Sequence, residues 1–145
     1  MEQQLQQTGV DLTLGKVFSF SSAGRIDFDN KERKLSETKE IPFENEGWVE
    51  LKKGCYKIQY NEIVKIPSDC AGFGLTRSSL LRCGAFVSTA LWDPGYEGRS
   101  ESLLIVENPK GISLKKNAKV LQLIFIMLEK KSEKLYEGKF KGENI

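Results

Sequence analysis

The segment AFVSTALWDPGYEGRSESLLIV, at residues 85–106, contains the pattern that decides the fold. It opens with an alternating apolar and polar stretch at 85–88 and closes with another apolar stretch at 102–106. Such stretches are typical of β-strands that bury at least one face. Between the two lies Asp93-Pro94-Gly95, a sequence typical of a turn. We therefore predict a strand, a turn and a second strand.

The same pattern continues along the chain in both directions. Further strand-like stretches lie at residues 10–14, 17–20, 56–60, 63–66 and 120–128. Turn sequences that contain Gly, Pro, Asn and Lys separate them. Short strands with turns at intervals of roughly ten residues favour an all-β jelly roll or barrel.

Only one segment has the features of a helix. Residues 78–84, SSLLRCG, begin with serines that suit a helix N-cap, and they end at Gly84, which suits the C′ position. We therefore predict one short helix within an otherwise all-β fold.

The length of 145 residues is enough for a single domain with one core. Residues 25–47 are polar and highly charged, so we expect them to form a long surface excursion. The last residues combine lysines and glycines with two aromatic side chains and cannot form a core alone. We expect a β domain over residues 1–134 and a flexible C-terminal flap over residues 135–145.

Composition excludes several classes of function. The formal net charge of +2, from 22 basic and 20 acidic side chains, argues against a nucleic-acid binder. Histidine is absent, so a zinc site would lack its usual nitrogen ligand. The three cysteines are isolated in sequence, as expected for reduced thiols. No stretch resembles a signal peptide or approaches the roughly 20 apolar residues of a membrane span. We expect a cytoplasmic protein that binds neither nucleic acid nor membrane.

The start of the predicted helix is a candidate phosphate site. Arg77, Ser78 and Ser79 together offer a guanidinium, two hydroxyls and free backbone N–H groups, which suit a phosphate. An ordinary helix cap beside a surface arginine explains the same residues equally well.

Polar residues in or beside the predicted strands are a second group of candidates. Asp11 and Gln122 interrupt apolar strands, and Asp93 and Tyr96 flank the Pro-Gly turn. Each also has a structural explanation, as a surface carboxylate, a hydrogen-bonded core amide or a turn residue. Near the C-terminus, glycines alternate with lysines and Phe140, which suits either a flap that closes over a ligand or a disordered tail.

The order of these segments is more specific than any one of them. GVDL at 9–12, RSSL at 77–80, WDPGYEG at 92–98, AKVLQLIF at 118–125 and YEGKFKG at 136–142 resemble the ordered motifs of the trimeric dUTPase and dCTP deaminase superfamily. The resemblance extends from residue 9 to the C-terminus and is closest to archaeal and archaeal-virus dUTPases. It implies a jelly roll of the β-clip type, assembled as a homotrimer with active sites at the subunit interfaces.

The resemblance also implies a role for each candidate residue. Asp93 would be catalytic, because it would hold the sugar 3′-hydroxyl and the attacking water. Tyr96 would pack beneath the deoxyribose and exclude a 2′-hydroxyl. Asp11 would anchor waters around a Mg²⁺ ion that the phosphates of dUTP hold. The other substrate-binding residues would be Arg77, Ser78 and Ser79 at the triphosphate, Ser88, Thr89, Ala90 and Leu91 at the base edge, Gln122 beside the phosphates, and Phe140 over the base.

The implied reaction is Mg²⁺-dependent hydrolysis of dUTP to dUMP and pyrophosphate, which limits uracil in DNA and supplies dUMP. A dCTP deaminase, or an enzyme with both activities, is one alternative. Deaminases of this superfamily place a glutamate ten residues after the motif aspartate, where this chain has Leu103. Glu101 lies on the same strand face, and Arg82 occupies a position that deaminases also use, so this alternative stays open. A non-catalytic nucleotide sensor with the same fold is the second alternative.

Overall fold

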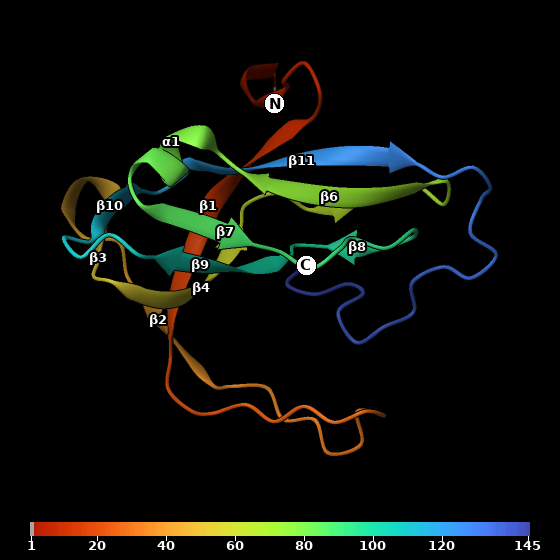
Figure 1. The fold of residues 1–145 in the computed structure, drawn as a ribbon, viewed down its shortest axis with the longest axis horizontal. Coiled ribbons are helices and arrows are strands. Elements are labelled where there is room, and N and C mark those ends of the chain that lie inside the picture. The colour runs from red at the N-terminus through yellow and green to blue at the C-terminus, as the bar shows by residue number, and fades with distance from the viewer. Residues whose placement is uncertain (1) are drawn as a thin grey trace.

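A computed structural model describes residues 2–145 of the protein. Within this range the regular elements are β-strands, one short α-helix and two short 3₁₀ helices (Figure 1). The prediction of an all-β fold with a single α-helix is confirmed. The elements in chain order are η1 (Glu2–Gln4), β1 (Val10–Phe20), β2 (Thr38–Ile41), η2 (Asn45–Gly47), β3 (Trp48–Leu51), β4 (Gly54–Tyr60), β5 (Val64–Lys65), β6 (Cys70–Thr76), α1 (Ser78–Arg82), β7 (Ala85–Ser88), β8 (Glu97–Gly98), β9 (Glu101–Val106), β10 (Ile112–Lys115) and β11 (Lys119–Met127).

The main sheet contains seven strands. Its order is β6-β11-β1-β4-β9-β7, and β2 pairs with β1 beside this path. Every pairing in it is antiparallel. The two ends of the order approach each other, because the Thr76 hydroxyl donates to the carbonyl of Val87 and accepts from its amide, both at 2.9 Å. The sheet therefore curls into a nearly closed barrel, and β10 with β3 and β5 with β8 form two smaller sheets.

Alternation along the strands builds the core of this barrel. In β9, for example, Ser102, Leu104 and Val106 are buried, while the residues between them are partly exposed. The largest fully buried side chain is that of Tyr60 in β4, which packs with leucines, isoleucines and valines from the neighbouring strands. Burial of such side chains is the main contribution to the stability of the fold.

The first predicted strands, 10–14 and 17–20, form one continuous strand, β1. Its pairing register shifts between Leu12 and Thr13 and again around Gly15. A side chain at position 15 would meet the backbone of β4, since its Cβ would lie 3.1 Å from the carbonyl oxygen of Gln59. Glycine at this irregularity allows β1 to continue instead of ending at a turn.

Strand β6, with the sequence CAGFGLT, was not predicted, because glycine is unfavourable inside strands. Its glycines make room for Trp92. A Cβ on Gly72 or on Gly74 would lie 2.9 Å from an atom of the Trp92 side chain. The backbone of Trp92 also pairs with Gly72 through two hydrogen bonds, of 2.8 and 3.1 Å. The indole is therefore buried directly against the strand, and this fixes the position of the chain just before Asp93.

Helix α1 occupies the predicted segment and ends as expected. Gly84 follows it with a φ of 76°, a left-handed conformation that favours glycine, and its amide donates to the carbonyl of Leu81 at 3.0 Å. The predicted N-cap is wrong by one residue, because Arg77 caps the helix without a side-chain hydrogen bond. Ser78 and Ser79 instead lie in the first turn, where their side chains are exposed.

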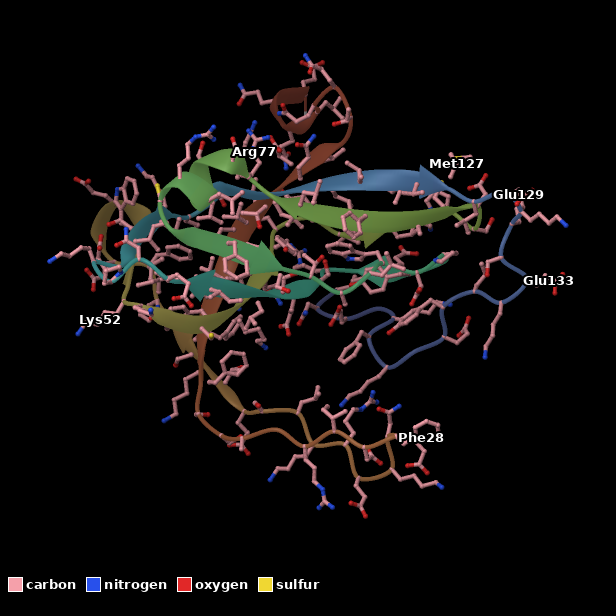
Figure 2. The ribbon with its side chains drawn as sticks, in the orientation of Figure 1. Phe28, Lys52, Arg77, Met127, Glu129 and Glu133 are labelled. Carbon is pink, nitrogen blue, oxygen red and sulfur yellow. The ribbon has the colours of Figure 1, made fainter. Side chains whose placement is uncertain are left out.

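Two segments lie outside the barrel. Residues 21–37 project away from it, with the fully exposed Phe28 near the far end (Figure 2). Strand β2 then returns to pair with β1, so the predicted excursion ends earlier than residue 47. Residues 128–145 form no helix or strand and run back past β8 (Figure 1). No helix within residues 2–145 has both the length and the apolar character needed to cross a membrane.

Candidate functional site

Asp93 occupies a turn that is anchored on both sides. Before it, Trp92 is buried against β6. After it, the amide of Gly95 donates to the carbonyl of Ile66 at 3.1 Å, and the amide of Tyr96 donates to the carbonyl of Asp93 at 3.0 Å. Gly95 has a φ of 81°, which a residue with a side chain would adopt only with strain. The carboxylate of Asp93 is therefore exposed on a backbone that is held in place.

Tyr96 follows this turn with its side chain turned inward, and it is only 5% exposed. Its ring meets the ring of Tyr136 edge to face, with centroids 5.7 Å apart. Its hydroxyl donates to Oε1 of Glu143 at 2.7 Å. Burial, and next the negative charge and hydrogen bond of Glu143, raise the pKa of Tyr96. At neutral pH the hydroxyl therefore remains a hydrogen-bond donor.

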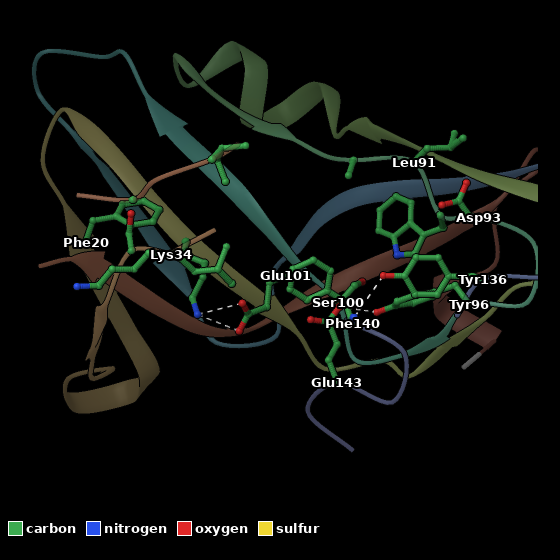
Figure 3. A pocket seen from close by; sticks show the side chains of 17 residues that line it. Phe20, Lys34, Leu91, Asp93, Tyr96, Ser100, Glu101, Tyr136, Phe140 and Glu143 are labelled. Carbon is green, nitrogen blue, oxygen red and sulfur yellow. Dashed lines mark hydrogen bonds and ion pairs between the residues drawn. The ribbon is translucent and has the colours of Figure 1, made fainter. Parts of the chain in front are cut away.

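Asp93 and Tyr96 line a cavity of about 580 Å³ (Figure 3). Figure 3 shows Phe20 and Lys34 at one end of it, Tyr96 and Tyr136 at the other, and Phe140 between them near Ser100. Of the residues predicted to bind substrate, Ala90, Leu91, Tyr96 and Phe140 line this cavity together with Asp93. Lys34, Lys57, Glu101 and Glu143 also line the cavity, and Asp93 is its exposed carboxylate. Apolar cavities with a few polar groups of this kind bind small organic molecules.

The remaining predicted residues lie elsewhere in the protein. Ser88 is exposed at the end of β7, and Thr89 packs near Gly74 of β6; neither lines the cavity. Arg77, labelled in Figure 2, lies just before α1, and it does not line the cavity either.

Asp11, Arg77 and Gln122 form a second polar group. Oδ1 of Asp11 accepts a hydrogen bond from Nη1 of Arg77 at 2.8 Å, and Oδ2 lies 3.2 Å from Nζ of Lys119. Gln6 also donates to Oδ2 at 2.8 Å. Gln122 is the cross-strand partner of Asp11 in β11. One carboxylate thus holds two cationic side chains beside the exposed serines of α1, and this leaves an excess of positive charge.

The arrangement around Asp11 bears on the predicted metal role. Asp11 is completely buried, and both of its oxygens already face cations or donors. Within residues 2–145, no three Cys, Asp or Glu side chains lie close enough together to ligate a metal ion. In this structure the Asp11 carboxylate holds the side chains of Arg77 and Lys119 in place.

Sequence patterns missed several residues that line the cavity. Lys57 of β4 and Glu101 of β9 form an ion pair at 3.0 Å at its wall, with both side chains only 26% exposed. Leu103, two residues along the same strand, does not line the cavity. Tyr136 and Glu143 reach it from the tail. The sequence names Glu101 only as a substitute for the deaminase glutamate; strand register brings it beside Lys57, and the path of the tail brings Tyr136 and Glu143 to the cavity.

Comparisons with known proteins agree with this structure. Residues 1–128 match the model of a family described as dCTP deaminase-like. The chain is 48% identical over 143 residues to a probable deoxyuridine 5′-triphosphate nucleotidohydrolase from Methanosarcina mazei. The aligned region covers 99% of this chain and 84% of that protein.

Solved structures share the fold at lower identity. A 2′-deoxycytidine 5′-triphosphate deaminase from Agrobacterium tumefaciens superposes with a TM-score of 0.61 at 21% identity, covering 86% of this chain and 41% of the deaminase. The native EIAV dUTPase superposes with a TM-score of 0.52 at 15% identity, covering 85% of this chain and 98% of that enzyme. The barrel thus has the dUTPase-like architecture that the motifs predict. The chain belongs to the dCTP deaminase-like family.

Proposed function

We propose that the protein hydrolyses dUTP to dUMP and pyrophosphate. The observation that carries this proposal is the convergence of Asp93, Tyr96 and Phe140 on one cavity, from a fixed turn and from the C-terminal tail. The high identity to a probable archaeal dUTP nucleotidohydrolase over nearly the whole chain supports it. Such an activity limits the uracil available for incorporation into DNA and supplies dUMP.

In this reaction Asp93 is the catalytic residue. Its exposed carboxylate orients a water molecule and accepts its proton while the water oxygen bonds to phosphorus. The bond between the α-phosphate and the β-phosphate breaks, and pyrophosphate leaves. The anchored turn contributes by holding the carboxylate in one place, since catalysis of this kind depends mainly on positioning.

Tyr96 and the cavity wall account for substrate choice. The buried ring of Tyr96 supports the deoxyribose and leaves no space for a 2′-hydroxyl. The backbone at Ala90 and Leu91 meets the edge of the base. Phe140 covers the base from the tail.

The triphosphate binds at Arg77, Ser78 and Ser79, supported by Gln122. Because this group is separate from the cavity of its own subunit, we propose that a neighbouring subunit supplies it. The outer face of β6 and β11 supports such an assembly, since the cross-strand partners Phe73 and Ile124 form an apolar surface next to Gln122. Phe73 is 43% exposed and Leu75 is 52% exposed, and large exposed apolar patches are typical of interfaces. The assembly we propose is a homotrimer.

We propose that magnesium binds together with the nucleotide. The phosphates of dUTP carry the ion, and its contribution is the neutralisation of their charge. Asp11 acts on the same phosphates indirectly, because it holds Arg77 and Lys119 in place.

Deamination of dCTP is the second candidate function, and the position of Glu101 is the observation that favours it. Glu101 lines the cavity, whereas Leu103 does not. However, both oxygens of Glu101 lie 3.0 Å from Nζ of Lys57, so the carboxylate is engaged in an ion pair. A deaminase would need this carboxylate free to activate water at the cytosine ring.

The test is incubation of the protein with Mg²⁺ and dUTP, dCTP, UTP or dTTP, with the products separated by chromatography. We expect dUMP from dUTP and no product from dCTP. Release of dUTP or dUMP from dCTP would assign the protein to the deaminase branch. Nucleotide binding without any product would assign it to a sensor.

A further inference from the structure

The last part of the tail, residues 136–145, is attached to its own subunit at two points. At the near point, the amide of Tyr136 donates to the carbonyl of Pro94 at 2.8 Å, and the Tyr136 ring packs on Tyr96. At the far point, the amide of Gly142 donates to the carbonyl of Glu97 at 2.7 Å. The amide of Arg99 then donates to the carbonyl of Glu143 at 2.9 Å. Both points lie on the segment 94–99, which directly follows Asp93.

Residues 137–141 form a closed loop between these points, and we call this loop the lid. Its conformation is supported internally, since the amide of Lys141 donates to the carbonyl of Gly138 at 3.1 Å. An ion pair of 2.7 Å joins Lys141 to Glu137. The lid carries Phe140 to the cavity that contains Asp93 (Figure 3). A loop that is fixed at both ends has far fewer conformations than a free tail.

At the far point, Asn144 and Arg99 exchange hydrogen bonds of 3.0 and 3.2 Å. The contact that reaches into the cavity is the hydrogen bond of 2.7 Å from the Tyr96 hydroxyl to Glu143. Glu143 is partly buried, and this burial raises its pKa. The hydrogen bond from Tyr96 lowers the pKa of Glu143. The negative charge of Glu101 raises this pKa, and the positive charge of Lys57 lowers it. Without the Tyr96 hydroxyl, the carboxylate would lose the donor that offsets its burial.

We propose that Glu143 is a positioning residue that fastens the far end of the lid to Tyr96, so that Phe140 closes the cavity of its own subunit. The catalytic consequence of this closure rests on the proposed function. Tyr96 then has two separable roles: its ring supports the sugar, and its hydroxyl holds the lid. Glu143 touches neither the reacting phosphate nor the attacking water, and it acts through the lid.

The attachment can be tested by amide hydrogen exchange without nucleotide. Loss of a hydrogen bond to a charged group weakens an attachment by about tenfold or more. We therefore expect the Gly142 and Arg99 amides to exchange roughly tenfold faster in Glu143→Ala and in Tyr96→Phe. Glu143→Gln should keep its protection, because the amide oxygen still accepts from Tyr96. Glu133→Gln, the same change at an exposed tail residue, is the matched control and should match the wild type.

The pH dependence of exchange protection tests whether the Glu143 carboxyl group itself holds the lid. A carboxylate whose pKa is raised by docking docks best when it is protonated. Protection in the wild type should therefore be greatest near and below 4.5, the ordinary pKa of a glutamate, and should fall as the pH rises through the raised value. Protection in Glu143→Gln should not change over this range. Wild-type protection in Glu143→Ala would overturn the proposal.

Closure within one subunit can be tested with mixed assemblies. Subunits that lack residues 135–145 are combined with Asp93→Asn subunits, and assemblies that contain both are isolated by affinity tags. If the lid closes over its own subunit, no site in a mixed assembly has both a lid and Asp93. The dUTP turnover should then not exceed the sum for the truncated protein alone and the Asp93→Asn protein alone. Turnover clearly above that sum would mean that the lid closes over a neighbour, and would overturn the proposal.

Kinetics provide the last measurement. Glu143→Ala should lower kcat for dUTP more than it raises KM, and Glu143→Gln should restore most of kcat. If the wild type failed to hydrolyse dUTP, the proposed function would be wrong, whereas the exchange measurements would still decide whether Glu143 holds the lid.

Discussion

Asp93 combines an exposed carboxylate with a backbone that is fixed by Trp92 and Gly95. We expect Asp93→Asn to keep dUTP binding and to lose turnover by roughly 10² to 10⁴, the usual contribution of a positioned general base. The amide has the same shape and can orient the water, but it cannot accept the proton. Single-turnover kinetics and a binding isotherm would measure the two effects separately. If turnover changed by only a few-fold, Asp93 would be a turn residue and nothing more.

Tyr96 is the residue to which we assign discrimination between sugars. Tyr96→Ala should narrow the preference for dUTP over UTP, because removal of the ring opens space for a 2′-hydroxyl. The ratio of the two kcat/KM values measures this preference. The ring is 5% exposed, so its loss should also cost about 3–5 kcal/mol of stability, and assays belong well below the unfolding temperature of the variant. An unchanged ratio would place Tyr96 outside the sugar pocket.

Among the elements, the tail is the one whose removal should separate folding from catalysis. The barrel core is formed by the strands up to β11, so a chain without residues 135–145 should still fold and assemble. Its turnover of dUTP should fall on the order of 10², since Phe140 no longer closes the cavity and water is no longer excluded. Circular dichroism and light scattering would check folding and assembly, and steady-state kinetics would check turnover. Full activity in the truncated protein would mean that the tail is not a lid.

The strands also show which parts of the fold can be predicted from the sequence. Strands that alternate, such as β4 and β9, were predicted almost to the residue, because their pattern depends only on which face is buried. Strand β6 was missed, since the reason for its glycines is a tryptophan that lies about twenty residues later in the chain. Local propensity carries no information about such a distant contact.

The candidate site shows the same limit. Asp93 and Tyr96 stand beside one turn, so a local motif could identify them. The contact between Glu143 and Tyr96 depends on the path of the tail, and the pairing of Lys57 with Glu101 depends on strand register. Lys57 and Glu143 became candidates only when the fold placed them beside Glu101 and Tyr96.

For the whole molecule, the apolar face of β6 and β11 should be the surface through which subunits associate. A charge in the centre of this face should prevent assembly, because it would be buried without a partner. We expect Phe73→Glu to be largely monomeric and inactive on dUTP, since Arg77 of the neighbour would be absent from each site. Phe28→Glu, at the far end of the excursion, is the matched control and should remain trimeric and active. Light scattering with an activity assay checks both variants, and an active monomer would contradict the shared site.

The close packing of Trp92 on Gly72 and Gly74 also limits how the sequence of this protein can diverge. A methyl group would lie 2.9 Å from Cβ of Trp92 at position 72 and 2.9 Å from Cζ3 of its indole at position 74, so either would shift the turn that carries Asp93. Selection for activity would therefore act on strand positions that never meet the nucleotide. Drift in β6 would be tolerated on its outer face, at Phe73 and Leu75, as long as the rest of the proposed interface changed with it. A randomised library of β6 would be expected to retain glycine at positions 72 and 74 under selection for turnover, and to accept small side chains there under selection for folding alone.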